Sequence, residues 1–309
     1  MTDIITLTMN PALDKSTSVE RVAPEMKLRC ERPDREPGGG GINVSRVVTR
    51  LGGASRAVFP AGGYTGDMLV DLLQAEDLTA EVVPVKNTTR ENLVVYERTS
   101  EQQFRFGMPG APLDESEVQA CLVALESGPD PAFIVASGSL PEGVPDDFYC
   151  AVAHKAKSRC AKLIVDSSGA PLRRVVREAG VYLLKPNLRE LRYLTDRPIE
   201  TETQQIEAAQ SLVDDGHAEV VVVSIGAGGA FMFTAEGHQH LRAPTVTIRS
   251  TVGAGDSMVA GMVTGLVRGE PIKRAVQLGI AAGSATVMSP GTQLCDPDDV
   301  KRLFELITT

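Results

Sequence analysis

The sequence contains no tryptophan, and aromatic residues make up only 4% of its 309 residues. The five cysteines are widely spaced without a CxxC pair, and the four histidines form no metal-binding pattern. This usage favours reduced thiols over a disulfide framework or a zinc site. No apolar run approaches the length of a membrane-spanning helix, and the first ten residues carry no secretory signal pattern. We therefore expect a cytoplasmic protein without membrane contact.

Three familiar nucleotide-binding signatures are also missing. The sequence has no GxxxxGK[ST] motif, which excludes a P-loop enzyme, and no HRD or DFG motif, which excludes a protein kinase. Gly226, Gly228 and Gly229 follow an apolar run, but the β-like residues 230–233 come next instead of a helix. That order excludes a Rossmann dinucleotide site.

Charge sets a condition on any phosphate-bearing substrate. The net charge is −9, which argues against nonspecific binding of nucleic acid. A phosphate would therefore have to be held by local cations or by backbone N–H groups against the overall field. Hydrophobic residues (42%) and charged residues (23%) occur at the levels of an ordinary globular protein.

Short apolar runs alternate with helical patterns along most of the chain. Runs of this kind are residues 4–9, 57–59, 133–135, 163–165, 181–184 and 220–223. The alternation predicts an α/β fold in which a mostly parallel sheet carries helices on both faces. No repeat, linker or low-complexity tract interrupts it, so we expect a single domain over residues 1–309.

A small β excursion interrupts this alternation. Residues 92–96 and 103–106 alternate in polarity around a polar turn, which predicts a hairpin. We expect residues 15–36 and 88–108 to come together as a lid over the carboxyl edge of the sheet, where ligands bind in such folds.

The strongest chemical motif is STVGAGDSM at residues 250–258, followed by a long apolar helix. Glycines there let the N–H groups of Gly253, Ala254 and Gly255 approach an anion, and the start of the helix adds its positive dipole end. Asp256 would repel an anion, but it suits the removal of a proton from a hydroxyl that attacks phosphorus. The alternative is that Asp256 is only a helix N-cap.

Two further motifs precede helices. In GGGGIN at residues 38–43, the glycines suit a close approach of the backbone to a ligand, and Asn43 suits a sugar hydroxyl, although a flexible turn is the alternative. In KPNLRE at residues 185–190, Asn187 and Glu190 lie on one helical face and could hold hydrated Mg²⁺. A capping box is the alternative there.

Taken in order, these motifs resemble those of the ribokinase-like carbohydrate kinases of the PfkB family. The resemblance also includes SGSLP at residues 137–141, DSSG at 166–169 and SIG at 224–226, and it covers essentially the whole chain. Within the family the sequence is most similar to the B-type 6-phosphofructokinases, through residues 27–30, 37–41, 105–110 and 291–295. Gln293 departs from that pattern, in which an arginine is expected. The related fructose-1-phosphate kinases usually carry a lysine in the glycine run, where this chain has Gly40.

The resemblance implies ATP-dependent phosphorylation of fructose 6-phosphate to fructose 1,6-bisphosphate, with Asp256 as general base and the N–H groups of Gly253 to Asp256 as an anion hole. It places the sugar and its phosphate near Asp14, Lys27, Gly39, Gly40, Asn43, Arg90 and Ser139. It places ATP near Lys185, Asn187, Ser224, Gly226, Gly228, Gly229 and Ser284.

The resemblance also implies metals and a partner. Glu190 would organise Mg²⁺ with ATP. A K⁺ ion would be held near Ser250, Val252, Thr286, Ser289 and Gly291. Members of this kind commonly pair their lids into a homodimer.

The lid cations support a phosphorylated sugar on other grounds. Lys27, Arg29, Arg90 and Arg105 all fall in the two lid segments, against the acidic average of the chain. A kinase of the same fold for fructose 1-phosphate or tagatose 6-phosphate is one alternative. A non-catalytic sugar-phosphate sensor is another, although such a sensor would not need Asp256 as a base.

Overall fold

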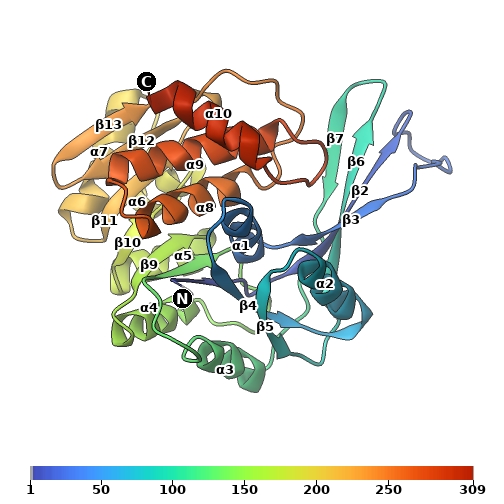
Figure 1. Ribbon diagram of the computed structural model, residues 1–309, viewed down its shortest axis with the longest axis horizontal. Coiled ribbons are helices and arrows are strands. Elements are labelled where there is room, and N and C mark those ends of the chain that lie inside the picture. The colour runs from blue at the N-terminus through green and yellow to red at the C-terminus, as the bar shows by residue number, and fades with distance from the viewer. Residues whose placement is uncertain (1–2, 309) are drawn as a thin grey trace.

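The computed structural model describes residues 3–308 and contains two β-sheets (Figure 1). The larger sheet has nine strands in the order β13-β12-β11-β10-β9-β8-β1-β4-β5. Its strands are β1 (Ile4–Leu7), β4 (Ser55–Ala61), β5 (Thr79–Pro84), β8 (Phe133–Ser137), β9 (Lys162–Asp166), β10 (Val181–Leu184), β11 (Ala218–Ser224), β12 (Ala230–Thr234) and β13 (Gly237–Leu241). All neighbours from β11 to β5 are parallel, and only β12 and β13 pair antiparallel, which confirms the mostly parallel sheet.

The parallel strands are short apolar runs because both of their faces are covered. Along β1, Ile4 points into one hydrophobic core, and Ile5 and Leu7 point into the other. All five residues of β8 are buried. This alternation of side chains between two buried faces is the physical basis of the sequence pattern.

Helices cover both faces of the large sheet (Figure 1). On one face lie α1 (Gly40–Arg50), α8 (Ala254–Val267), α9 (Ile272–Val287) and α10 (Pro297–Thr308). On the other lie α3 (Glu115–Ala124), α4 (Phe148–Ser158), α5 (Gly169–Glu178), α6 (Leu188–Thr195) and α7 (Glu202–Asp214). Helix α2 (Gly63–Ala75) packs Leu69 and Leu73 against β4, in a third small core with Phe59.

A second, four-stranded sheet projects from the body of the molecule (Figure 1). Its order is β3-β2-β6-β7, with β2 (Ala12–Val19), β3 (Asp34–Gly38), β6 (Arg90–Glu97) and β7 (Gln102–Phe106). Strands β6 and β7 form the predicted antiparallel hairpin. The parallel pairing of β2 with β6 joins the two chain segments that were expected to form the lid.

Two helices begin at distinct local signals. Helix α2 begins at Gly63, which adopts the left-handed region (φ 65°) at the turn that starts the helix. Helix α3 was not anticipated, although Asp114 and Glu117 form a capping box at its start. Among residues 3–308, no helix combines the length and hydrophobicity that a membrane crossing requires.

Candidate active site

Polar side chains gather at the carboxyl edge of the large sheet. Parallel strands end at the same edge, and β1 and its neighbours deliver Asn10, Ser137, Asp166, Lys185 and Ser224 there. The chain leaves β1 toward β4 on one side and returns to β8 on the other. Such a reversal of strand order opens a crevice at the carboxyl edge.

Helix α8 begins at this edge with free backbone donors. Its N-cap is Gly253, in the left-handed region (φ 73°), without a side-chain cap. Asp256 is therefore the third residue of the helix, and the N-cap interpretation of Asp256 is wrong. The first N–H groups of a helix have no intrahelical acceptor, and they carry the positive end of the helix dipole. The predicted anion hole is thus a helix start with Asp256 beside it.

Asp256 lies in an environment that suits a base. Its Oδ2 accepts a hydrogen bond of 2.8 Å from Nδ2 of Asn43 on α1. Burial, with the nearby carboxylate of Asp166, raises the pKa of Asp256 to about 7. The Asn43 amide and the Lys185 ammonium oppose this rise. A carboxyl group with a pKa near neutrality can both accept and release a proton.

A buried ion pair stands next to the start of α8. Lys185 is 5% exposed, and its Nζ lies 3.1 Å from Oδ1 of Asp166. Burial alone would lower the pKa of Lys185, but the carboxylates of Asp166, Glu190 and Asp256 outweigh it and raise that pKa. A side chain on Gly255 would meet this ammonium group at 3.5 Å. Lys185 therefore supplies a fixed positive charge at the anion hole.

Asp166 was not predicted as a site residue, although its motif contributed to the family resemblance. Its signal was available, because it is the first charged residue after the buried run of β9. Lys185 follows the adjacent strand β10 in the same way. Two oppositely charged residues that end neighbouring parallel strands are brought together by the sheet.

The glycine run packs tightly instead of forming a flexible turn. Gly39 adopts φ 117°, which other residues rarely reach. A Cβ atom on Gly40 would lie 2.3 Å from Oγ of Ser137, and one on Gly41 would lie 2.6 Å from the carbonyl oxygen of Leu7. The run brings β3 and α1 directly against the ends of β1 and β8, and it leaves no room for a side chain at position 40.

The lid sheet carries Asp14 to the edge of this site. Oδ1 of Asp14 accepts a hydrogen bond of 2.8 Å from Nδ2 of Asn92. Burial raises the pKa of Asp14, opposed by Asn92 and by the guanidinium groups of Arg90, Arg46 and Arg105. The Asp14 carboxylate can accept a hydrogen bond from a sugar hydroxyl, and the neighbouring guanidinium groups can bind an anion.

Two predicted phosphate ligands lie near the base of the lid. Arg90 is opposite Ala12 in the β2–β6 pairing, and it donates to the carbonyl oxygens of Asn10 and Met108, both at 2.9 Å. Ser139 is exposed, and its Oγ accepts from Nδ2 of Asn10 at 3.1 Å. Asn10 thus connects Arg90 and Ser139.

Lys27 is not brought to these residues within one chain. It lies exposed in the loop after β2, beyond Val19, whereas Arg90 and Ser139 lie near Asn10, just before the opposite end of that strand. A strand rises about 3.3 Å per residue, so the two ends of β2 are roughly 20 Å apart. The expected convergence of Lys27 and Arg90 on one phosphate is therefore absent from the single chain.

A cavity of about 340 Å³ adjoins the start of α8 and has the character of a nucleotide site. Four of the predicted ATP residues line it: Ser224, Gly226, Gly229 and Ser284. Val246, Ile248, Met258, Ile280 and Val287 give it apolar walls, which suit a flat heterocycle. The cavity reaches Ala254 and Gly255, so a bound nucleotide would extend its phosphates toward the anion hole.

Gly228 does not line this cavity. Its carbonyl oxygen bonds Nε2 of His240 at 2.9 Å, and a Cβ atom on it would meet Ile225 at 2.8 Å. Gly229 is held more tightly, since a Cβ atom there would lie 2.1 Å from the carbonyl oxygen of Leu241. Gly228 and Gly229 thus shape the turn that brings Gly226 to the cavity.

Asn187 and Glu190 form the capping box that was the alternative interpretation. Oδ1 of Asn187 accepts from the N–H of Glu190 at 3.0 Å, and Oε2 of Glu190 accepts from the N–H of Asn187 at 2.9 Å. Burial, with the nearby carboxylate of Asp166, raises the pKa of Glu190. Within residues 3–308, no group of three or more His, Cys, Asp or Glu side chains is placed to hold a metal. A magnesium ion here would thus need phosphate oxygens or water as further ligands.

Four of the five residues predicted for K⁺ (Ser250, Val252, Ser289 and Gly291) lie in loops, and Thr286 lies in the last turn of α9. Oγ of Ser250 donates to the carbonyl oxygen of Gly291 at 2.6 Å, and the N–H of Val252 donates to Oγ of Ser250 at 3.3 Å. The N–H of Ser289 donates to the carbonyl oxygen of Thr286 at 3.0 Å, at the end of α9. The carbonyl groups at a helix end favour a cation.

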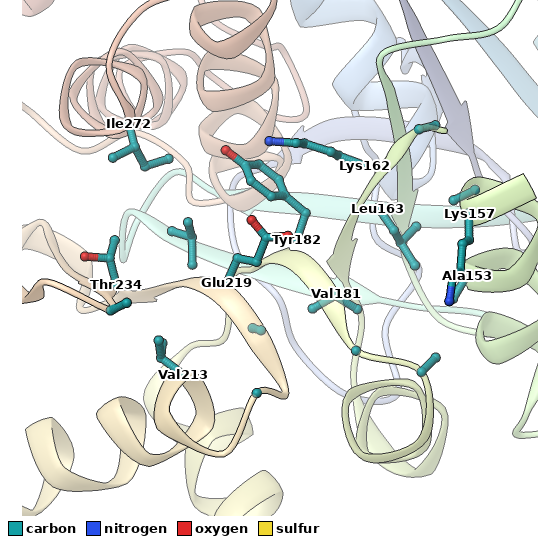
Figure 2. Close-up of a pocket in the computed structure, with 18 of the residues that line it drawn as sticks. Ala153, Lys157, Lys162, Leu163, Val181, Tyr182, Val213, Glu219, Thr234 and Ile272 are labelled. Carbon is teal, nitrogen blue, oxygen red and sulfur yellow. The ribbon is translucent and has the colours of Figure 1, made fainter. Parts of the chain in front are cut away.

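A wider cavity, of about 1140 Å³, lies at the opposite, amino edge of the sheet. Figure 2 shows Tyr182, Lys162 and Glu219 around it, from the beginnings of β10, β9 and β11. Nζ of Lys162 lies 4.1 Å from the centre of the Tyr182 ring. None of the predicted site residues lines this cavity, so it is separate from the candidate active site.

Comparisons with known proteins identify the family of this chain. The profile of a family described as "pfkB family carbohydrate kinase" matches residues 4–299. The ATP-dependent 6-phosphofructokinase isozyme 2 of Mycobacterium tuberculosis H37Rv is 47% identical over 98% of this chain and 89% of its own length. The enzyme of the same name from Escherichia coli K12 is 42% identical over 100% of both chains. A 1-phosphofructokinase of Bacillus subtilis is 33% identical over 93% of both.

Solved structures are similar over the same length. Phosphofructokinase-2 of Escherichia coli in complex with fructose-6-phosphate superposes with a TM-score of 0.95, at 39% identity over 100% of both chains. The same enzyme has been solved with potassium (TM-score 0.95, 41% identity) and in a tetrameric inhibited form (TM-score 0.94, 40% identity), again over 100% of both chains. A ribokinase of Arabidopsis thaliana shares the fold, with a TM-score of 0.76 at 19% identity over 99% of both chains.

Proposed function

The chain belongs to the pfkB family of carbohydrate kinases, and we propose that it is an ATP-dependent 6-phosphofructokinase that converts fructose 6-phosphate to fructose 1,6-bisphosphate. The observation that carries this proposal is Asp256, held by Asn43 beside the free N–H groups at the start of α8. A carboxyl group at an anion site is unfavourable for binding alone, but it is suited to phosphoryl transfer to a hydroxyl.

The proposed chemistry uses groups that are already in place. Asp256 takes the proton of the attacking sugar hydroxyl as that oxygen bonds to the γ-phosphorus and the bond to the β-phosphate oxygen breaks. The N–H groups at the start of α8 stabilise the charge on the transferring group. Lys185, buried beside Gly255, adds a positive charge that needs no rearrangement. Asp14 and Asn43 hold the sugar hydroxyls.

Comparison of acceptors tests this function. The coupled release of ADP is measured with fructose 6-phosphate, fructose 1-phosphate and tagatose 6-phosphate at matched concentrations. We expect the highest kcat/KM for fructose 6-phosphate, since Gly40 leaves no room for the lysine that the 1-phosphate enzymes carry. Preference for another of the three would reassign the substrate within the same fold. If none of the three sugar phosphates supports ATP turnover, the result would favour the non-catalytic sensor.

The pH dependence of turnover follows from Asp256. With its pKa raised to about 7, the carboxyl group is protonated below that pH and cannot act as a base. We expect kcat at saturating substrates to fall on the acid side with a midpoint near pH 7. The variant Asn43→Ala, which removes a hydrogen bond that lowers this pKa, should move the midpoint to higher pH. If kcat stays constant as the pH falls from neutral to well below pH 7, Asp256 is excluded as the base.

Magnesium is proposed to bind with ATP near Glu190. Glu190, in the first turn of α6, lies close enough to Asp166 for that carboxylate to raise its pKa, and a magnesium ion there would neutralise phosphate charge. We expect Glu190→Gln to raise the Mg²⁺ concentration needed for half-maximal activity and to lower kcat, with an unchanged melting temperature. Gln still closes the capping box, so it is matched in structure. A lower melting temperature with an unchanged Mg²⁺ profile would assign Glu190 to capping alone.

A potassium ion is proposed for the loops around Ser250 and Gly291. Support comes from their shared hydrogen bond, from the carbonyl groups at the end of α9 nearby, and from the potassium in the structure of the Escherichia coli relative. These loops lead directly into Gly253, so an ion there would hold the anion hole in shape.

A homodimer through the lid is proposed to complete the phosphate site. Lys27 is too far from Arg90 to share a phosphate within one chain, but the tip of a partner's lid could deliver it. The lid sheet also exposes Phe106 (46%) and carries Met26 (69%) and Met108 (47%) nearby, which are unusually apolar for a solvent-facing surface. Two lids packed face to face would cover these side chains.

A further inference from the structure

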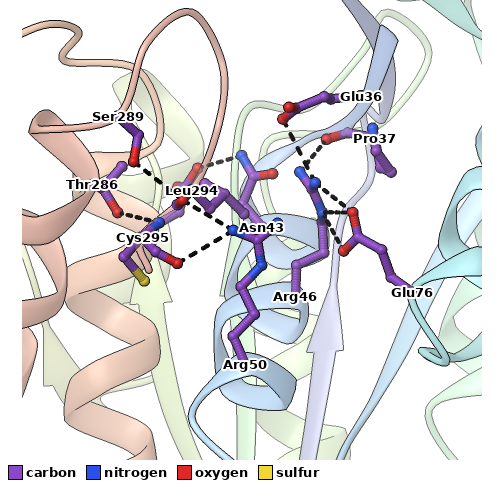
Figure 3. A network of polar contacts seen from close by, with 11 residues as sticks. Glu36, Pro37, Asn43, Arg46, Arg50, Glu76, Thr286, Ser289, Leu294 and Cys295 are labelled. Atoms are coloured by element: carbon purple, nitrogen blue, oxygen red, sulfur yellow. Dashed lines mark hydrogen bonds and ion pairs between the residues drawn. The ribbon is translucent and has the colours of Figure 1, made fainter. Parts of the chain in front are cut away.

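A buried arginine outside the proposed reaction links the lid to the body. Arg46 on α1 is 2% exposed. Its Nε and Nη2 bind the carboxylate of Glu76, with the shortest distance 2.6 Å, and its Nη1 donates to the carbonyl oxygen of Pro37 at 2.9 Å. Figure 3 shows this guanidinium between Glu76 and β3. A charge so deeply buried is unusual unless all its partners are fixed.

The partners of Arg46 belong to the strand pair that carries the sugar-binding edge. Pro37 lies on β3 opposite Leu13 of β2, and its neighbour Glu36 lies opposite Asp14. Oε2 of Glu36 is 3.6 Å from Nη2 of Arg46 and has no hydrogen-bond partner among residues 3–308. Arg46 therefore holds β3 one residue away from the position that faces Asp14.

The same face of α1 also holds the catalytic carboxylate. Asn43, Arg46 and Arg50 are spaced three and four residues apart, which places them on one side of a helix. Asn43 binds Asp256, and Nη1 of Arg50 donates to the carbonyl oxygen of Leu294 at 2.9 Å. Figure 3 shows the three side chains on α1 in this order. One helix face thus contacts the lid strand, the catalytic base and the loop after α9.

We infer that Arg46 is a positioning residue that sets the distance between the sugar held by Asp14 and the carboxylate of Asp256. Asp14 lies on strand β2 of the lid and Asp256 on helix α8. Helix α1 contacts both parts, because Asn43 binds Asp256 and Arg46 binds β3, the strand that pairs with β2. A shift of β3 relative to α1 would misplace the attacking hydroxyl, and an error of about 1 Å can cost about a hundredfold in rate. The inference deepens the proposed function and rests on it for the identity of the sugar.

The primary test variant is Arg46→Lys, with Arg46→Gln as the stronger change. Lysine keeps the charge but cannot hold Glu76 with two donors and Pro37 at once. The matched control is Arg159→Lys, since Arg159 is also buried and bonds Asp130 at 2.9 Å and the carbonyl oxygen of Gly128 at 2.8 Å, far from the lid. Melting temperature is measured for all variants.

Two readouts separate positioning from stability. In Arg46→Lys we expect kcat with fructose 6-phosphate to fall about tenfold, with the KM for ATP nearly unchanged. We also expect the NMR titration midpoint of the Asp256 carboxyl carbon to rise, because a shifted α1 weakens the hydrogen bond from Asn43. The groups that face this carboxyl are Asn43 on α1, Asp166 at the end of β9, Lys185 after β10 and Asp14 on β2.

The outcomes are distinct. A raised Asp256 midpoint and a lower kcat in a folded Arg46→Lys, with neither change in Arg159→Lys, support the inference. Parental kcat and midpoint in the folded variant, or a loss of activity that only follows the unfolded fraction, overturn it. If the parent fails to phosphorylate fructose 6-phosphate, the proposed function fails. The Asp256 midpoint, which needs no substrate, still decides the role of Arg46.

Discussion

Asp256→Asn is expected to bind both substrates and to lose about 10²- to 10⁴-fold in kcat, the usual contribution of a positioned general base. An amide has the shape of the carboxyl group and can still accept the hydrogen bond from Asn43, but it cannot take a proton. The helix start and Lys185 remain, so the KM values for ATP and for the sugar phosphate should change little. Steady-state kinetics with both substrates varied give the measurement.

Stability provides the control for this variant. Burial raises the pKa of Asp256 in the folded chain above its unfolded value, so the ionised group destabilises the fold at neutral pH. Protonation below the unfolded pKa would remove that cost, and a neutral amide removes it at every pH. Asp256→Asn should therefore melt at the same temperature as the parent or higher. Near-parental kcat would show that Asp256 has no role as a base.

The parallel sheet could be predicted because short apolar runs between helices are a local pattern in the sequence. Strands such as β8 and β10 are buried on both faces, and a short apolar run between helices has few other solutions. The hairpin of β6 and β7 was equally local, since a polar turn separates two alternating runs. In contrast, the capping box that begins α3 lies in a polar segment whose signal was overlooked.

The candidate site was predicted where glycines and chain order determine it. Asp256, Asn43 and four residues that line the candidate nucleotide cavity were expected as site residues. All of them except Ser284 belong to a motif at the end of a strand or the start of a helix. The ion pair of Asp166 with Lys185 depends on which strands are neighbours. The role of Arg46 depends on a contact with a strand that precedes its own helix. Spacing in the sequence does not report such contacts.

The sequence predicts that Lys27 binds the sugar phosphate, but in the single chain it lies far from Arg90. If a partner's lid brings Lys27 to the phosphate, its removal should have a large and specific effect. It is exposed, and no hydrogen bond or ion pair of its side chain is found among residues 3–308, so Lys27→Ala should leave the melting temperature unchanged. A lost hydrogen bond to a charged phosphate should raise the KM for fructose 6-phosphate roughly 10- to 100-fold. The KM for ATP should change much less. Arg32→Ala, which removes another exposed cation of the loop between β2 and β3, is the matched control. If both variants raise the KM for fructose 6-phosphate equally, or if Lys27→Ala leaves it unchanged, Lys27 is only a solvated side chain of the lid.

Mixing two defective variants locates the Lys27 that serves each site. If Lys27 acts on the partner's site, a dimer of one Lys27→Ala chain and one Asp256→Asn chain contains one site with both changes and one site with neither. After random exchange of subunits, about a quarter of all sites should then be intact, because half of the dimers are mixed and each has one native site. Activity at low fructose 6-phosphate should rise on mixing, well above the sum of the separate variants. If Lys27 served its own chain, every site would keep one defect and mixing would restore nothing. The rise would therefore establish both the lid-to-lid dimer and the path by which this cation reaches the sugar phosphate.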